Sequence, residues 1–338
     1  MTLAIVWFFI WALLWAIYFM TDGFDLGIGA MMPFVAKDET ERRILYNATG
    51  PLWDGNEVWL ITAGGVTFAA FPKTYAVMFS AFHEAMTLLV LALIVRGISF
   101  EFRSKVATPA GRKVCDLCQF LGSVLAAVLL GVAFANLFRG LPLVAGVRQG
   151  TVLALLNPYA LAGGVLFLAV FLLHGALWLA IRTTDRMHDK AARTAGGLWY
   201  VVAILAVAFL LYTAIETPLW NNYLKTPVLL IVPALAVAGL FAIKPALAKK
   251  RFGSAWLASA GMIVSITFFG VIGMYPNMLP SVIEPAANSI TLFDAASGPL
   301  TLKVMLAVVL LFVPLVLIYQ AWAYRLFSGK LDISELVY

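Results

Sequence analysis

Four carboxylates near the start of the chain have the type and spacing for proton transfer. Asp22 and Asp25 lie in TDGFDLG, and Asp54 and Glu57 lie in PLWDGNEVWL, so both segments have the pattern Asp-Gly-x-acid. In a helix, residues three apart share a face, so each pair places two carboxylates together. Close carboxylates share protons, which suits a proton relay. The structural alternative is helix capping, for which Asp54 at a helix start is well suited.

A fifth acid, Glu84, follows His83 about ten residues into an apolar segment that starts near residue 74. At about 1.5 Å rise per residue, a continuous helix places Glu84 roughly 15 Å deep, near the middle of a bilayer. A carboxylate at that depth is costly, so we expect a functional reason for it. His83 and His174 lie in different apolar segments and could serve as haem ligands, with hydrogen-bonded helix contacts as the alternative.

Other candidate residues carry weaker signals. Trp53 could contact a quinone ring or a partner subunit, although tryptophans also form interfacial belts. Cys115 and Cys118 form a single CxxC, which we interpret as two reduced thiols. We expect no metal site in this chain, because no HExxH or comparable ligand spacing is present. The absence of a Walker A sequence argues against ATP-driven transport by this chain alone.

These residues belong to a strongly apolar chain. Of its 338 residues, 63% are hydrophobic and 12% are charged, with a mean hydropathy of +0.95. A soluble domain has about 45–50% apolar and about 25% charged residues. This composition excludes disorder, a disulfide-rich scaffold and a cytosolic enzyme, and the long apolar runs do not fit a β-barrel. The sequence therefore predicts an all-α integral membrane protein, without nucleic acid as a partner.

Apolar runs of about 20 residues predict nine transmembrane helices. They lie near residues 3–35, 52–72, 74–100, 117–138, 156–181, 197–215, 226–247, 253–275 and 301–326. We treat the whole chain as a single polytopic membrane domain. Helices one to four occupy about 1–140, helices five to eight about 155–275, and helix nine about 301–326. The N-terminal segment lacks a positive region and a cleavage site, so we expect it to be a retained helix.

Basic residues predict the orientation, because Lys and Arg collect in cytoplasmic loops. Of the 23 basic residues, 18 fall in alternate segments between the predicted spans. These segments are 36–51, 96–116, 182–196, 244–252 and the stretch after Ala323. The sequence thus predicts an N-terminus outside and a C-terminus in the cytoplasm. Asp22, Asp25, Asp54 and Glu57 then all lie toward the cytoplasmic side.

Several longer segments, in order along nearly the whole chain, resemble subunit II of the cytochrome bd-type quinol:oxygen oxidases. The matching segments are GFDLG (23–27), GPLWDGNEVWLITAGG (50–65), FAAFP (68–72), RGISFEFRSK (96–105), GVAFANLFRGLPL (131–143), LNPYALAGG (156–164), MYPNMLPS (274–281) and SGPLTLKVM (297–305). The resemblance implies nine helices arranged as two four-helix bundles plus a peripheral ninth.

The resemblance also implies a function within a complex in the bacterial cytoplasmic membrane. The complex oxidises quinol and reduces oxygen to water in the aerobic respiratory chain. Its b-type and d-type haems and the quinol-oxidising loop belong to subunit I, and single-helix subunits often accompany the pair. The resemblance implies no haem ligand in this chain, which alone is not catalytic. It places the family's tryptophan–aspartate pair at Trp53 and Asp54, a candidate for proton transfer, with Asp22 and Asp25 in second place.

Two alternatives from other classes also fit the residues. A proton-coupled secondary transporter would share the buried acids and basic loops, but inverted repeats of half the chain are not apparent. A purely structural membrane subunit would use every acid as a cap or a packing contact. Kinetics of acid-to-amide variants would distinguish this structural subunit from a proton path.

Overall fold

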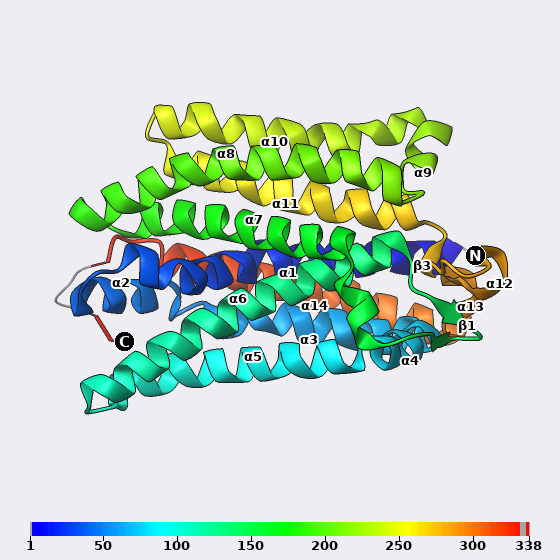
Figure 1. Cartoon of the computed structure of the whole chain (residues 1–338), viewed down its shortest axis with the longest axis horizontal. Helices are drawn as coiled ribbons and strands as arrows, with labels where there is room; N and C mark the ends of the chain where they lie inside the picture. Colours follow the sequence, from blue (N-terminus) through cyan, green and yellow to red (C-terminus); the bar gives the residue numbers. More distant parts are fainter. Residues whose placement is uncertain (1, 332–335, 338) are drawn as a thin grey trace.

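Most of the chain forms long helices that lie roughly along one axis (Figure 1). The computed structural model describes residues 2–331 and 336–337. The α-helices are α1 (Thr2–Val35), α2 (Glu39–Thr49), α3 (Trp53–Ala70), α4 (Pro72–Ala81), α5 (His83–Phe102), α6 (Pro109–Arg139), α7 (Pro158–Arg182), α8 (Asp185–Glu216), α9 (Trp220–Lys225), α10 (Ile231–Ala248), α11 (Phe252–Met274), α12 (Pro285–Asn288), α13 (Leu292–Ala295) and α14 (Pro299–Leu326). The 3-10 helices are η1 (Arg103–Lys105), η2 (Val152–Leu156) and η3 (Pro227–Leu230). The strands β1 (Leu143–Val144) and β2 (Val147–Arg148) form one antiparallel pair, and β3 (Asn277–Leu279) and β4 (Ile290–Thr291) form another.

Eight helical segments of the described chain are long and apolar enough to cross a membrane. They comprise α1, α5, α6, α7, α8, α10, α11 and α14, some extended by an adjoining 3-10 turn. The remaining predicted span, near 52–72, is the 18-residue helix α3. The first turn of α3 carries Asp54, Asn56 and Glu57, and these polar side chains lower its mean hydropathy. Because α3 packs lengthwise against α1, we count it with these eight as a further long helix of the bundle.

The long helices pack in two groups that meet along α1 and α6. One group contains α1, α3, α5 and α6, and the other contains α7, α8, α10 and α11, while α14 lies on the outside of α1 and α3. Helix α1 packs against α7 and α11, and α6 packs against α7, so these contacts together hold the two groups in place. A methyl group on Gly27 would lie 1.8 Å from the carbonyl oxygen of Phe171, so these two helices meet backbone to backbone.

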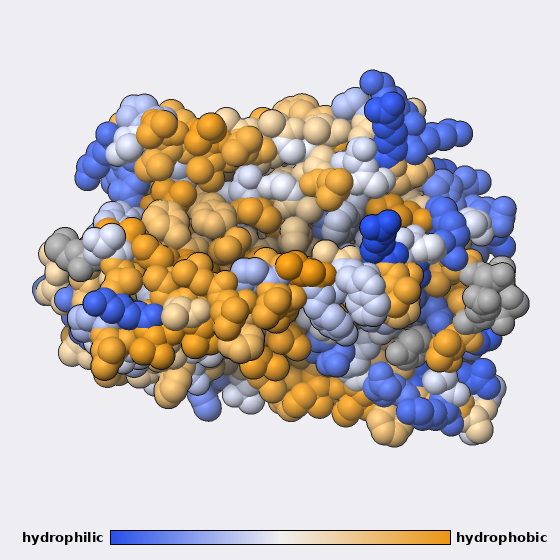
Figure 2. All heavy atoms as spheres, turned by 180° about the vertical axis from the view of Figure 1, so that it is seen from behind, coloured by the Kyte–Doolittle hydropathy of each residue, from blue (hydrophilic) through white to orange (hydrophobic). Residues whose placement is uncertain are grey.

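The two ends of the bundle differ in composition. One end carries the N-terminus, both strand pairs and the short helices α9, α12 and α13 (Figure 1). The other end carries α2, the α7–α8 turn and the α10–α11 turn, where most of the predicted basic segments fall. Figure 2 shows a broad hydrophobic band between hydrophilic ends. We call the second end the basic end and the first the strand end.

The predicted span 74–100 is not one continuous helix, and in this respect the prediction was wrong. The chain breaks at Phe82, whose backbone leaves helical geometry at φ −106° and ψ 18°. The segment before the break, α4, packs against β2, β3 and α13 at the strand end. Only α5, which begins at His83, runs along the bundle. Helix α4 therefore packs against the strand-end loops and does not form part of a membrane-crossing helix.

Candidate functional site

A buried arginine joins three helices through two carboxylates. Arg96 of α5 is completely buried, and its Nη2 lies 3.3 Å from Oδ1 of Asp22 on α1. Its Nη1 donates to Oε1 of Glu57 on α3, whose side chain is 20% exposed. Buried charges are tolerated when they are paired and hydrogen-bonded. These contacts bring together one acid from each Asp-Gly-x-acid segment, as their shared position toward one membrane side predicted.

A second set of hydrogen bonds extends this cluster toward α14. The Asn56 amide Nδ2 donates to Oδ2 of Asp25 at 2.7 Å. Its Oδ1 accepts from Gln320 Nε2 and from the Tyr324 hydroxyl, each at 2.9 Å. Asn56 therefore bridges the buried carboxylate of α1 and the polar side chains of α14. We call the set of Asp22, Asp25, Asn56, Glu57 and Arg96 the acidic cluster.

Some buried polar atoms beside the acidic cluster have no hydrogen-bond partner within the described residues. They are Asp25 Oδ1 and Trp15 Nε1, and between them on α1 the Tyr18 hydroxyl and the Asp22 carboxylate interact with each other. Their spacing of three, four and three residues places all of them along one face of α1. Buried polar groups without a protein partner are usually satisfied by ordered water. This face of α1 thus carries a line of polar groups that leads from the acidic cluster into the bundle, with unpartnered atoms at its two ends.

The acidic cluster contains more carboxylates than cations. Asp22, Asp25 and Glu57 face a single guanidinium, that of Arg96, among the described side chains. Uncompensated negative charge in a low-dielectric interior is costly, and a carboxyl group avoids the cost by binding a proton. The arrangement therefore favours retention of protons by the three carboxylates, whose combined charge one permanently protonated guanidinium does not balance. That is the chemistry expected of a proton-holding site.

Asp54 does not join the acidic cluster. It lies in the first turn of α3, is exposed, and is not the N-cap residue, which is Leu52. Its helix face also carries the exposed side chains of Val58, Ile61 and Phe68. Asp54 is thus the charged end of an otherwise apolar outer stripe. The acid of α3 that reaches Arg96 is Glu57, three residues after Asp54.

The neighbouring Trp53 is partly buried and stacks on Phe100, with ring centroids 5.2 Å apart and planes 10° apart. A Cβ on Gly97 of α5 would lie 3.3 Å from the Trp53 ring, so the ring packs closely against the backbone there. Trp53 therefore locks the first turn of α3 against α5. One face of its indole is already occupied by a protein ring, which limits the quinone contact predicted from sequence.

Glu84 lies far from the depth that a continuous helix predicts, and that expectation was wrong. It sits in the first turn of α5, at the strand end, with half of its side chain exposed. Arg148 of β2 donates to both of its carboxylate oxygens, at 3.1 and 3.3 Å. The break at Phe82 restarts the helix, so Glu84 begins a span instead of lying within it. His83 is exposed at the same end.

His174 is a buried histidine with both ring nitrogens in use. Nδ1 lies 3.0 Å from Ser259 Oγ, and Nε2 lies 3.0 Å from the carbonyl oxygen of Met20. Its ring stacks on Trp256 at 5.0 Å. These contacts match the structural alternative for His174. Within residues 2–331 and 336–337, no group of three or more His, Cys, Asp or Glu residues has the arrangement of a metal site.

Ion pairs fasten α2 at the basic end, close to the acidic cluster. Arg103 donates to Glu39 at 3.0 and 3.1 Å and to Asp116 on α6. Hydrogen bonds from Arg103 hold the pKa of the Glu39 carboxyl below its usual value. Burial raises the pKa of Glu41, but its hydrogen bond from Lys190 of α8 and its other partners outweigh burial and lower this pKa overall.

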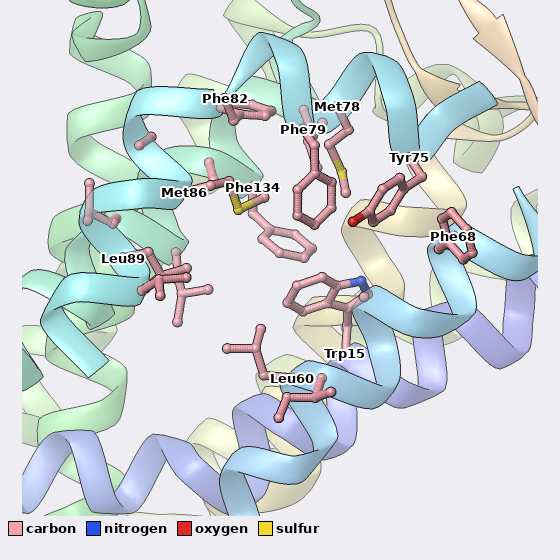
Figure 3. A pocket seen from close by; sticks show the side chains of 18 of the residues that line it. Trp15, Leu60, Phe68, Tyr75, Met78, Phe79, Phe82, Met86, Leu89 and Phe134 are labelled. Atoms are coloured by element: carbon pink, nitrogen blue, oxygen red, sulfur yellow. The ribbon is translucent and has the colours of Figure 1, made fainter. Parts of the chain in front are cut away.

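An apolar cavity of about 560 Å³ opens between α1, α3, α4, α5 and α6. Figure 3 shows Phe79, Phe82, Met86 and Phe134 around it, with Trp15 facing them from α1. Its lining is almost wholly aromatic and aliphatic, so it suits an apolar molecule and does not provide acid–base chemistry. Trp53 is not among its lining residues.

Two members of the acidic cluster, Asn56 and Arg96, were not predicted from the sequence. Arg96 was assigned to a basic cytoplasmic segment, because it ends the apolar run of the predicted third span. The helix in fact continues past it to Phe102, and Arg96 is completely buried. The signal that could have found it is a charge count, since buried acids on two helices require a cation on a third.

The fold and the acidic cluster together define a polytopic membrane subunit with a buried, ionisable centre. Residues 3–327 match the family model for cytochrome bd terminal oxidase subunit II. The chain therefore belongs to the cytochrome bd oxidase subunit II family. As a member of it, the chain is a subunit of a quinol-oxidising oxidoreductase complex.

Individual relatives match over nearly the full length. A probable cytochrome oxidase subunit 2 of Haemophilus influenzae is 36% identical, covering 98% of this chain and 95% of its own. The cytochrome bd-I ubiquinol oxidase subunit 2 of Escherichia coli K12 is 34% identical, covering 97% and 96%. The cytochrome bd ubiquinol oxidase subunit 2 of Bacillus subtilis is 34% identical, covering 98% and 97%. A chain of the Geobacillus thermodenitrificans bd oxidase structure, 17% identical, has the same fold with a TM-score of 0.79, covering 97% of this chain and 99% of that chain.

Proposed function

We propose that this chain is the haem-free subunit of its oxidase, and that the b-type and d-type haems of the complex are bound by the partner, subunit I. The family implies both the haems and the partner. In this chain, His174 has both nitrogens hydrogen-bonded, and Nδ1 of His188 donates to the Ala180 carbonyl at 2.8 Å. His83 is exposed at the strand end. None of these environments suits an axial haem ligand.

We further propose that the chain carries protons from the cytoplasm toward the oxygen-reducing partner. The observation that carries the proposal is the single Arg96 guanidinium opposite Asp22, Asp25 and Glu57. Such a site holds protons and can release them when the local field changes. The polar atoms without partners along α1 provide places for the water molecules that a relay needs.

Asp54 connects this store of protons to the outside of the chain. It lies one helical turn from Glu57 and at the basic end of the exposed α3 stripe. We place subunit I against this stripe, because Val58, Ile61 and Phe68 form an apolar surface with an acid at one end. Protons then pass between Glu57 and Asp54 at the boundary between the two subunits. Glu84, paired with Arg148 at the opposite end, takes no part.

The membrane setting of this proposal follows the basic residues. The basic end faces the cytoplasm of a bacterial inner membrane, and the N-terminus faces outside. Quinol is oxidised at the partner subunit, and single-helix subunits and lipids complete the assembly. The family assignment replaces the transporter alternative, whereas the purely structural alternative is separated from proton transfer by experiment.

The test is the oxygen consumption of the purified complex with Asp54→Asn. We expect turnover to fall at least about tenfold, because a positioned proton-transfer group contributes about 10² to 10⁴ in rate. Haem content, from the reduced-minus-oxidised spectrum, should stay at the wild-type level. Glu101→Gln, which also removes one exposed acid near the basic end, is the matched control and should keep normal turnover. Haem loss together with activity would indicate a structural role for Asp54, and wild-type turnover would refute the relay.

A further inference from the structure

A cleft opens at the basic end between α8 and α10, on the side of the chain away from α3 and α5 (Figure 1). Its volume is about 400 Å³, within the range of small-ligand sites. The walls that matter for its chemistry come from His188, Asp189, Gly196, Lys244, Lys250 and Phe252. We call it the α8–α10 cleft.

Two lysines and one aspartate leave the cleft with a net positive charge. Neither Lys244 nor Lys250 forms an ion pair with any described acid, although Asp189 also borders the cleft. The Lys244 ammonium donates to the Tyr200 hydroxyl at 2.7 Å and lies 3.8 Å from the centre of that ring. An ammonium held this way retains two more hydrogen-bond donors. The cleft can therefore offer donors to an anion.

The backbone at Lys250 is in a conformation that normally belongs to glycine. Its φ is +54°, in the left-handed region. The amide of Lys250 bonds the Leu247 carbonyl at 2.9 Å, and the amide of Arg251 bonds the Ala246 carbonyl at 2.8 Å, so α10 ends in a Schellman motif. Glycine is the usual residue at that position because it has no Cβ. A lysine at this position has a strained backbone, and its side chain lines the cleft.

The surroundings of the cleft place it at the level of lipid headgroups. Tyr200 of α8 lies beside Lys244 and is 55% exposed, and exposed aromatic residues with a polar group are typical of the membrane–water interface. Toward the membrane, α8 exposes Ile204 and Val207, which are 70% and 58% exposed, and α10 exposes apolar side chains as well. The cleft is thus continuous with a surface suited to acyl chains. Helix α11 begins at Phe252, on the wall of the cleft, without a side-chain cap, so its first amides also favour an anion.

From this combination we propose that the α8–α10 cleft binds the phosphate of an anionic phospholipid. Lys244 and Lys250 hold the phosphate, and the acyl chains lie along the exposed faces of α8 and α10. The open space beside Gly196 leaves room for the headgroup, because nothing lies within 4 Å of the position of a Cβ there. The site is independent of the acidic cluster and of the proton path.

Native mass spectrometry of the delipidated complex, titrated with phosphatidylglycerol, tests the charge requirement. Each lysine near an anionic headgroup should contribute about fivefold in affinity. Lys250→Gly removes the charge and provides the residue that the backbone prefers, so folding should be retained. We expect it to weaken phosphatidylglycerol binding about fivefold. Lys249→Gln removes a neighbouring charge that does not line the cleft and should change binding less than twofold.

The shape requirement has its own matched pair. Gly196→Leu fills the cleft, whereas Gly197→Leu adds the same side chain next to it, and a Cβ at either position meets no atom within 4 Å. We expect only Gly196→Leu to abolish retention of phosphatidylglycerol. Equal effects of the two leucines, or of Lys250→Gly and Lys249→Gln, would overturn the proposal. So would equal affinity for phosphatidylcholine, or binding of free glycerol phosphate as tight as that of the lipid.

Discussion

Removal of the Arg96 guanidinium should test whether the acidic cluster is held together by charge. Arg96→Met keeps an apolar stem of similar length but leaves Asp22 and Glu57 without their cation. Arg96 and Asp22 are both 0% exposed, so the loss is that of one partner from a buried ion pair, about 3–5 kcal/mol. Near the midpoint, the unfolding entropy is about 2.1 cal/mol/K per residue. For the 338 residues of this chain, the loss converts to a decrease in melting temperature of roughly 4–7 °C.

The assay is the apparent melting temperature of the purified complex at a fixed heating rate, followed by tryptophan fluorescence. The double variant Arg96→Met with Asp22→Asn provides the decisive comparison, because it removes both charges of the buried pair. Neutral replacement of both partners costs much less than an orphaned charge, so the double variant should recover at least about 2 kcal/mol relative to Arg96→Met. Strictly additive destabilisation by the two substitutions would refute the electrostatic account of the cluster.

Three further outcomes are expected. Because the folded-state pKa of Glu41 is lowered, its ion pair with Lys190 stabilises α2 above the unfolded pKa of about 4.5, and this contribution is lost as the pH falls through the folded value. Proteolysis of α2 should therefore increase at acid pH, and Glu41→Gln should remove that dependence. Gly27→Ala should destabilise the complex by about 1–3 kcal/mol through overpacking, and its melting temperature and yield should fall. Gly64→Ala, where a Cβ meets no atom within 4 Å, should change neither. His174→Gln should lower stability while the haem spectrum per complex stays unchanged; loss of one haem signal would contradict the haem-free assignment.

The spans and the meeting of the two acidic segments could be predicted from sequence because both depend on local rules. A run of apolar residues defines a span by itself, and three-residue spacing places Asp22 and Asp25 on one face of α1. The same spacing did not bring Asp54 into the cluster with Glu57, because Asp54 is exposed whereas Glu57 reaches Arg96. The orientation rule then brings Asp22 and Glu57 to the same side of the membrane. The ion pairs with Arg96 agree with that expectation.

Arg96 and Glu84 show where local rules fail. The end of an apolar run does not reveal whether a helix continues, so the sequence assigned Arg96 to a loop although it is buried. The predicted depth of Glu84 assumed one helix through residue 82, but packing of α4 on the strand-end loops breaks it there. Both outcomes depend on neighbours distant in sequence, which hydropathy does not report.

The central position of α1 has a consequence for biogenesis. Helix α1, which is synthesised before α5, carries Asp22 and Asp25, yet the cation that pairs with Asp22 arrives 74 residues later, on α5. Until α5 enters the bilayer, these carboxylates stay in the membrane only if they bind protons or a temporary partner. Helix α1 also packs against α7 and α11, which are synthesised later still. The nascent chain must therefore hold this largely buried helix in the membrane until its partners are synthesised.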